Sequence, residues 1–447
     1  MNSIESRFTE SPRRLSVLDH ADVLVLGGGS GGVGAAIAAA RNGARTILVE
    51  RFGAFGGTWT SGLLSSIMPF PYVKGLFQEI LNEVAASGGW RRSETEDPYA
   101  PGPNGSPGAP GHGGIYDAEV MKRVLDRMVV EAGVKPYFFL QVAGAFRDGN
   151  RIEAIIVESK EGRHVLTADY FIDASGDGDI AHHAGVPTEY GRTEDGQVQP
   201  MTLIFKMEGV DDARAEAHCR SDPRLAETWQ RAKLAGDVTI PRENVLLSRS
   251  PVPGQWAFNT TRIHGKNGTR VREVTEAMIE GRRQAFEVAA FMRSYVDGFE
   301  KARVSETAGH IGVRESRRIL GDYTLTSDDI IHAGSFDDAI ARGNWYVDIH
   351  SPTGQGTTTV GPPDGKFYEI PFRSLRPRGV DNLLIASRCI DSTHEAHAAV
   401  RITPQVVAIG QAAGTAAALC HGAALCNIRD LDTARLRETL RSQGAYV

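Results

Sequence analysis

Three glycines and one glutamate near the N-terminus have the types and spacing that most clearly indicate a chemistry. Gly27, Gly29 and Gly32 follow an apolar run in the spacing G-x-G-x-x-G, and Glu50 ends a second apolar run. In this pattern the glycines allow a tight turn, a close approach of backbone to a pyrophosphate, and close packing of helix against strand. The following helix offers N–H groups to phosphates, and the carboxylate can accept hydrogen bonds from ribose hydroxyls. Glycine-rich turns also occur without ligands, but strand, helix and acid together predict a dinucleotide site.

Histidines and arginines in the C-terminal half are candidates for proton transfer and substrate binding. His394 and His397 precede a helix of small residues, and a histidine of near-neutral pKa suits acid–base catalysis. Their spacing also resembles a metal pair, but no clear third ligand accompanies them, so we predict no metal site. Arg314 and Arg401 can clamp a substrate carboxylate or stabilise an anionic cofactor. The structural alternatives are an ordinary hydrogen-bonded role for each histidine and a buried ion pair between Arg314 and Glu315.

The elements that must position these residues are apolar strands and amphipathic helices. Strands are expected over 22–26 and 46–50, with a helix over 33–41 between them. The Pro- and Gly-rich stretch 91–114 has no periodicity and is either a surface insertion or a lid. Other elements expected in the first part are helices over 74–87 and 118–132, the latter capped by Asp117 and Gly133, and strands over 138–142, 151–158, 164–166 and 170–173.

The middle of the chain has a different pattern of expected strands and helices from its two ends. Short strands over 202–207, 256–261 and 344–349 accompany a long helix over 274–295. The C-terminal part again has the pattern of the N-terminal part, with a buried-type strand over 382–386 and a small-residue helix over 403–419. We therefore expect a discontinuous first domain, 21–185 plus 375–447, and an inserted domain, 186–374, with substrate between them.

Composition limits the class of protein. The chain has 447 residues, 41% of them hydrophobic, and a net charge of −6, which argues against a general nucleic-acid or membrane-surface role. No run of 18 apolar residues predicts a membrane span, and residues 1–20 lack the apolar stretch of a signal peptide. Four cysteines form no C-x-x-C pair, which disfavours a zinc site and a redox-active disulfide. We expect a cytoplasmic protein.

Several segments resemble one family. They are 27–50, 55–60, 173–179, 314–322, 368–373, 380–388, 394–396 with Arg401, and 410–415. Together they resemble the broad bacterial family of FAD-dependent oxidoreductases with a glutathione-reductase-like FAD fold. The resemblance implies FAD as cofactor and an α/β fold, in which a Rossmann-like FAD-binding domain with a parallel sheet and a β meander carries an inserted α+β substrate domain. It implies flavin chemistry without specifying a reaction.

We accordingly predict hydride transfer between a small organic substrate and flavin N5. The expected catalytic residues are His394, Arg401, Arg314 and His397. The expected cofactor-binding residues are Gly27, Gly29, Ser30, Gly31, Gly32, Glu50, Arg51, Gly56, Gly57, Thr58, Val142, Ala174, Gly176, Asp177, Thr403 and Gly410. The short segment 180–184 is expected to be a helix. Asp177 or Asp179 could bond a ribityl or ribose hydroxyl of the cofactor, and the alternative role for either residue is the N-cap of this helix.

The sequence is compatible with several alternatives. The reaction could instead be that of a flavin-dependent monooxygenase, or the chain could be a flavoprotein in RNA modification or scaffolding, although its acidic charge counts against RNA. NAD in place of FAD is a further option. Oxygen, a quinone or a partner protein could accept the electrons, and a homo-oligomer is compatible with the sequence.

Overall fold

A seven-stranded sheet is the centre of the computed structural model, which describes residues 10–68, 70–92, 113–354 and 356–447. Its strand order is β6-β2-β1-β9-β8-β7, with β20 also paired to β9. The parallel strands are β1 (Val17–Leu26), β2 (Thr46–Glu50), β6 (Lys135–Phe138), β9 (Gly162–Asp173) and β20 (Leu383–Ile385). Residues 21–26 of β1 are all buried, as expected for a strand covered on both faces.

The long strand β9 joins the parallel sheet to an antiparallel meander. Its first half pairs with β8 (Arg151–Ser159), which in turn pairs with β7 (Gln141–Asp148), both antiparallel. Its last residues pair instead with β20, with Phe171 opposite Leu383. The C-terminal segment thereby joins the sheet that the N-terminal segment begins, and the expected α/β fold with a parallel sheet and a β meander is confirmed.

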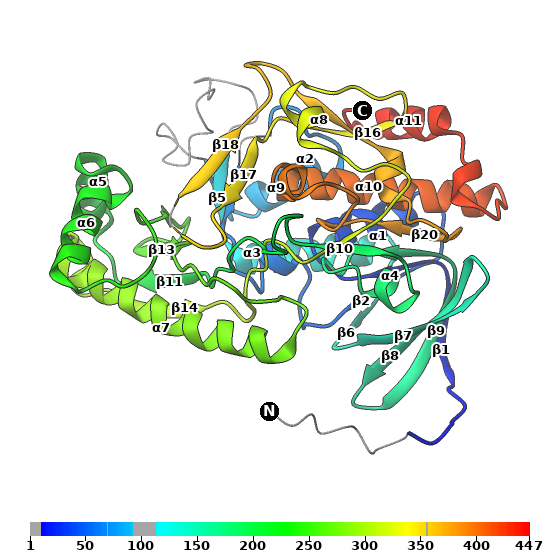
Figure 1. Ribbon diagram of the computed structural model, residues 1–447, viewed down its shortest axis with the longest axis horizontal. Coiled ribbons are helices and arrows are strands. Elements are labelled where there is room, and N and C mark those ends of the chain that lie inside the picture. Colours follow the sequence, from blue (N-terminus) through cyan, green and yellow to red (C-terminus); the bar gives the residue numbers. More distant parts are fainter. Residues whose placement is uncertain (1–9, 69, 93–112, 355) are drawn as a thin grey trace.

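Two helices of small residues, α1 (Ser30–Arg41) and α10 (Thr403–Gly422), pack against each other beside this sheet (Figure 1). A Cβ atom on Gly410 would lie 2.1 Å from the Gly31 carbonyl oxygen, and one on Gly414 would lie 2.0 Å from that of Ala35. Neither distance leaves room for a side chain. Glycine at these two positions therefore lets the backbones of the two helices touch, which fixes the start of α10 relative to the glycine-rich turn.

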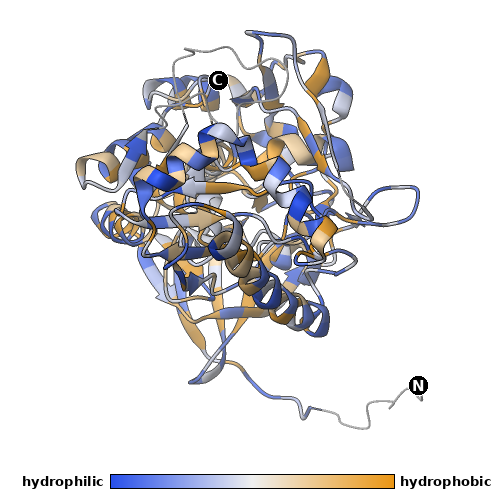
Figure 2. Cartoon of the chain, turned by 90° about the vertical axis from the view of Figure 1, so that its left-hand side faces the viewer, coloured by the Kyte–Doolittle hydropathy of each residue, from blue (hydrophilic) through white to orange (hydrophobic). Residues whose placement is uncertain are grey.

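A second region lies at one end of the molecule and has its own apolar core (Figure 1). Its four-stranded sheet has the order β12-β13-β11-β14. Buried Trp229, Phe258 and Phe291 fill the space between this sheet and the helices. Hydrophilic and hydrophobic residues alternate around its helices, as Figure 2 shows for this end of the molecule. The elements are β11 (Phe205–Glu208), β12 (Leu247–Arg249), β13 (Gln255–Phe258), β14 (Arg303–Thr307), α5 (Asp212–Ser221), α6 (Ala226–Ala235) and α7 (Val271–Tyr295).

Shorter elements complete the described part of the chain. The helices are α2 (Leu76–Ala86), α3 (Ala118–Glu131), α4 (Asp179–His183), α8 (Ser327–Ile331), α9 (His394–Val400) and α11 (Thr433–Ser442). The strands are β3 (Ser66–Ile67), β4 (Trp90–Arg92), β5 (Gly114–Tyr116), β10 (Thr188–Tyr190), β15 (Arg317–Ile319), β16 (Ala339–Gly343), β17 (Val347–His350), β18 (Thr357–Val360) and β19 (Tyr368–Pro371).

Two expectations about the elements are corrected by the structure. The strand expected over 138–142 is interrupted because Phe139 has a positive φ of 56°, so that β6 ends before it and β7 begins after it. The two short strands expected over 164–166 and 170–173 are one continuous strand, β9. Of the insertion expected over 91–114, residues 93–112 lie outside the described residues. Among the described residues, none of the helices is both long enough and apolar enough to span a membrane.

Candidate active site

The glycine-rich turn sits between β1 and α1 and is held by the end of β2. Gly27 has a φ of 93°, and its N–H donates to the Val49 carbonyl at 2.7 Å. The Gly28 N–H donates to Glu50 Oε2 at 2.7 Å, and the Phe52 N–H donates to Glu50 Oε1 at 2.8 Å. Burial raises the pKa of Glu50, whereas these backbone N–H groups lower it. The carboxylate therefore fixes the turn as well as standing where a ribose acid is expected.

A second glycine turn lies against the first. The Gly56 N–H donates to the Gly28 carbonyl at 2.7 Å, and both Gly56 and Gly57 have positive φ. A Cβ atom on Gly57 would lie 3.1 Å from Gly29 Cα. Thr58 follows in the short helix Gly57–Trp59. The two turns, 22 or more residues apart in the sequence, therefore form one surface of backbone.

This surface fits a pyrophosphate. A Cβ atom on Gly29 would meet nothing within 4 Å, so open space lies at the N-terminus of α1. No side chain caps α1, which begins at Ser30, so the N–H groups of its first turn are available to an anion. Gly32, by contrast, is needed for packing, because its Cβ would lie 1.7 Å from the Gly27 carbonyl oxygen.

The turn after β9 is built around two aspartates. Buried Asp173 accepts hydrogen bonds from the N–H groups of Ser175 and Ala181, and so shapes the turn. Asp177 Oδ1 accepts from Ser316 Oγ at 2.5 Å and from Arg388 Nη2 at 2.6 Å. The N-cap alternative for Asp177 and Asp179 is wrong, because the N-cap residue of α4 is Gly178.

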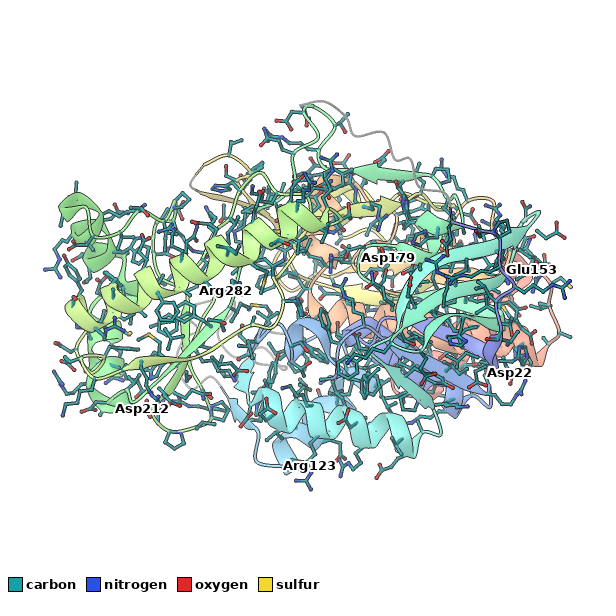
Figure 3. The ribbon with its side chains drawn as sticks, turned by 90° about the horizontal axis from the view of Figure 1, so that it is seen from below. Asp22, Arg123, Glu153, Asp179, Asp212 and Arg282 are labelled. Atoms are coloured by element: carbon teal, nitrogen blue, oxygen red, sulfur yellow. The ribbon has the colours of Figure 1, made fainter. Side chains whose placement is uncertain are left out.

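Two other residues of this turn, Ala174 and Gly176, were also expected at the cofactor. Ala174 packs on the first turn, since a Cβ on Gly27 would lie 2.4 Å from the Ala174 carbonyl oxygen. Gly176 has a φ of 85° and faces the Arg388 guanidinium. Burial, together with the nearby charges of Asp173 and Asp177, raises the pKa of Asp179 to about 6. Figure 3 shows Asp179 beside the strands of the large sheet, far from Asp212 in the helical region.

The remaining residues expected at the cofactor have different surroundings. Val142 is buried in β7, two residues beyond Leu140, whose N–H donates to the Glu50 carbonyl at 3.2 Å. The exposed Arg51 guanidinium lies over the Phe52 ring. Gly31 and Gly410 have packing roles in the contact between α1 and α10 described above.

The N-terminus of α10 is a second uncapped helix end. Thr403 is its first residue, Pro404 follows, and no side chain caps it. Proline is favoured there because it has no N–H group to leave unpaired. The partial positive charge of a 20-residue helix is therefore available at Thr403.

His394 is held by a buried glutamate that the sequence reasoning did not place in the site. His394 Nδ1 lies 2.8 Å from Glu315 Oε1, and Glu315 is fully buried. Glu315 also accepts from Arg318 Nη1 at 2.8 Å and from the Gln199 N–H at 3.1 Å. A carboxylate that receives two other donors acts as an acceptor, so the contact with Glu315 assigns a proton to His394 Nδ1.

His397 has a different environment. It is fully buried, and within the described part of the chain neither of its ring nitrogens has a hydrogen-bond partner. Burial lowers the pKa of His397 well below its usual value, and the nearby charges of Arg401 and Arg318 lower it further. A histidine that stays neutral and has no exposed surface is poorly suited to proton exchange with a substrate, so we do not retain it as a catalytic residue.

The two predicted arginines lie in one region. Arg314 Nη1 donates to the Pro200 carbonyl at 2.6 Å and to Thr202 Oγ1 at 2.5 Å. The ion pair suggested for Arg314 and Glu315 is absent from the ion pairs of the described residues, because Arg318 takes that carboxylate. Arg401, at the C-terminal end of α9, lies 3.6 Å from Asp348 Oδ2. Burial lowers the pKa of both arginines.

The comparison with known families decides the identity at the level of the family. A model described as FAD dependent oxidoreductase matches residues 22–440. The chain belongs to the FAD-dependent oxidoreductase family. Its cofactor is FAD, and the protein is an oxidoreductase. The glycine turns, Glu50 and Asp177 stay our predicted contacts for the adenosine, pyrophosphate and ribityl parts of that cofactor.

Solved structures agree on the fold. A geranylgeranyl bacteriochlorophyll reductase-like protein from Thermoplasma acidophilum matches with a TM-score of 0.51 and 13% identity, over 95% of this chain and 84% of that chain. A myxobacterial chondrochloren halogenase matches with a TM-score of 0.46 and 17% identity, over 94% of this chain and 78% of that chain. No curated protein matches the sequence. At these identities the first structure supports the fold and not a reaction.

Proposed function

We propose that this FAD-dependent enzyme oxidises a small organic substrate by removing a hydride from a carbon that bears a hydroxyl or amino group. The observation that carries this proposal is the buried pair of His394 and Glu315. When bound, FAD accepts two electrons as a hydride at N5. Oxidation of an alcohol or amine also releases a proton, and the protein must supply a group that takes it.

His394 is that group. Its Nδ1–H donates to Glu315, which leaves Nε2 as a proton acceptor and fixes the plane of the ring. The substrate C–H bond breaks with its electron pair leaving as hydride, and the substrate O–H or N–H proton moves to His394 Nε2. The imidazolium that results is stabilised by the Glu315 carboxylate at 2.8 Å.

The N-termini of α1 and α10 have separate tasks in this proposal. The N-terminus of α1 would bind the pyrophosphate, and the N-terminus of α10 would stabilise negative charge on the reduced cofactor. We further propose the domain division 21–185 with 375–447 for the cofactor and 186–374 for the substrate. The separate apolar core formed by residues between 205 and 302 supports this division for that part of the chain. Buried residues between 319 and 372 pack instead into the core of the large sheet.

The test is anaerobic flavin reduction by substrate in a rapid-mixing experiment. Replacing the base by His394→Gln should slow flavin reduction by about 10²- to 10⁴-fold, the usual contribution of a positioned acid–base group. His332→Gln is the matched control, since His332 is exposed and its ring lies within hydrogen-bond distance of the Asp328 carbonyl, one turn before it in the chain. Equal rates of flavin reduction in the His394 variant and the control would show that His394 is not the base.

The same experiment separates the monooxygenase alternative. A monooxygenase needs an external electron donor before oxygen can react, so its substrate alone cannot bleach the flavin. Bleaching by an organic substrate without oxygen or a nicotinamide donor supports oxidation by hydride removal.

A further inference from the structure

A cluster of arginines lies next to the catalytic pair. It consists of Arg242, Arg262, Arg314 and Arg401 and comes from four separate segments of the chain. Arg242 and Arg262 are 3% and 2% exposed. Burial lowers the pKa of Arg314 well below its usual value, and the charges of the other three guanidinium groups lower it further. Like charges repel, so such a cluster is costly to assemble unless an anion joins it.

The carboxylates near the cluster do not balance it. Among the described residues, the carboxylates that interact electrostatically with these arginines include Asp348 and Glu243. Asp348 lies 3.6 Å from Arg401, and Glu243 lies 3.9 Å from Arg262. Glu315 also acts on Arg401, but it is already paired with Arg318. Among the described residues, the three guanidinium groups of Arg262, Arg314 and Arg401 therefore outnumber the two carboxylates, Asp348 and Glu243, that remain for them.

The guanidinium groups of Arg262 and Arg401 make long contacts that a ligand could replace, whereas Arg314 Nη1 already donates two short hydrogen bonds. Arg262 Nη2 lies 3.3 Å from His350 Nδ1, and Arg262 Nη1 lies 3.3 Å from the Gly354 carbonyl. Arg401 Nη2 lies 3.4 Å from the Asp348 carbonyl. Charge-assisted hydrogen bonds to a carboxylate are shorter, about 2.7–2.9 Å.

Buried donors without partners lie in the same place. Gln199 is 1% exposed, and within the described residues its side-chain Nε2 has no hydrogen-bond partner. The same holds for Arg401 Nε. Buried donors are paired in almost all native structures, so these two indicate an acceptor that binds here.

Gln199 also connects the cluster to the catalytic pair. Its N–H donates to Glu315 Oε2 at 3.1 Å, and its Oε1 accepts from the His350 N–H at 3.5 Å. Arg314 directly precedes Glu315 in the chain. The cluster therefore borders His394 and lies on other segments than the glycine turns that fit the pyrophosphate.

We infer that the substrate is a small organic acid whose carboxylate binds Arg262, Arg314 and Arg401, with the Gln199 amide as a further donor. This inference rests on the proposed function in that it places the reacting carbon beside His394. The planar, forked guanidinium group matches a carboxylate in two hydrogen bonds, which suits arginine rather than lysine for this task.

Equilibrium binding to the FAD-loaded enzyme tests the inference without requiring turnover. Calorimetric titration with succinate, butyrate and the neutral succinamide should give binding of the two acids and at least 10-fold weaker binding of the amide. Inorganic sulfate should compete with succinate. Equal affinity for succinate and succinamide, or no binding of either acid at millimolar concentration, would overturn the inference.

Variants locate the binding to the cluster. Arg262→Met should weaken succinate binding by about 10- to 100-fold, the usual effect of losing a hydrogen bond to a charged group. Arg262→Lys keeps the positive charge but not the forked guanidinium group, and it should lose less affinity for succinate than Arg262→Met. Arg283→Met is the control, because Arg283 is exposed on α7 and pairs with Glu280 and Glu287 of the same helix. An unchanged affinity in both Arg262 variants, with FAD still bound, would contradict the assignment.

The failure of this inference differs from the failure of the proposed function. Acids that bind but never bleach the flavin anaerobically would support the carboxylate site and contradict hydride removal from those acids. A neutral alcohol or amine that bleaches the flavin while acids do not bind would support hydride removal and contradict the carboxylate site.

Discussion

Alanine at Gly29 should weaken FAD binding without weakening the fold, whereas alanine at Gly414 should do the reverse. Gly29 has a φ of −67°, which alanine adopts, and its Cβ would meet no protein atom within 4 Å. The unfolding free energy of the Gly29→Ala protein should therefore differ from that of the wild type by less than about 1 kcal/mol. The methyl group instead fills the space that we assign to the pyrophosphate.

The magnitudes follow from the same geometry. An extra methyl group in a tightly packed contact costs about 1–3 kcal/mol. Applied to the cofactor contact, this raises the Kd for FAD about 5- to 150-fold. A Cβ on Gly414 would lie 2.0 Å from the Ala35 carbonyl oxygen, so α10 would have to move away from α1. The better helix propensity of alanine offsets about 1 kcal/mol, so we expect a net loss of up to about 2 kcal/mol of stability.

The assay pairs urea unfolding of the apoprotein with quenching of FAD fluorescence on reconstitution. Wild-type affinity for FAD in the Gly29→Ala protein would refute the assignment of this space to the cofactor. A loss of stability in Gly29→Ala as large as that in Gly414→Ala would refute the distinction between binding and packing roles.

Three further perturbations have defined outcomes. Glu315→Gln leaves the buried Arg318 without its close partner and should cost about 3–5 kcal/mol of stability while slowing flavin reduction; a variant with unchanged melting temperature and reduction rate would contradict the role of Glu315. Asp179 has a pKa raised from 3.8 to about 6 in the fold, so the stability it contributes is greatest below about pH 4 and is lost as pH rises through 6. Asp179→Asn should therefore flatten the pH dependence of the unfolding free energy between these values, and an unaltered profile would exclude this titration. Asp117→Ala removes the side chain that accepts from the Glu119 N–H at the start of α3 and should cost about 1 kcal/mol in urea unfolding; no measurable loss would mean that the cap is dispensable.

The sequence predicted the cofactor half of the molecule well because local rules determine it. The spacing of Gly27, Gly29 and Gly32 specifies a strand, a turn and a helix within one continuous segment, and these form β1 and α1. Asp117 caps α3 as its type and position predicted. Glu50 ends β2, whose observed bounds equal the expected ones.

Pairings between distant segments were beyond the sequence reasoning. Glu315 and His394 are separated by 79 positions, and nothing in either local pattern indicates their contact. Arg262 follows β13 in the second region and reaches His350 88 positions away. The positive φ of Phe139 likewise depends on the hydrogen bond of its N–H to the Phe52 carbonyl rather than on its own propensity.

The central claim is that an organic substrate reduces the FAD of this enzyme directly. The measurement that tests it is the visible absorbance of the FAD-loaded enzyme under anaerobic conditions, during titration with small 2-hydroxy and 2-amino acids and then with NADH and NADPH. The account predicts that at least one of the acids bleaches the flavin band without a nicotinamide donor. A flavin that stays oxidised with every acid and also with neutral alcohols and amines, and that bleaches only with NADH or NADPH, would contradict it and would favour monooxygenase chemistry.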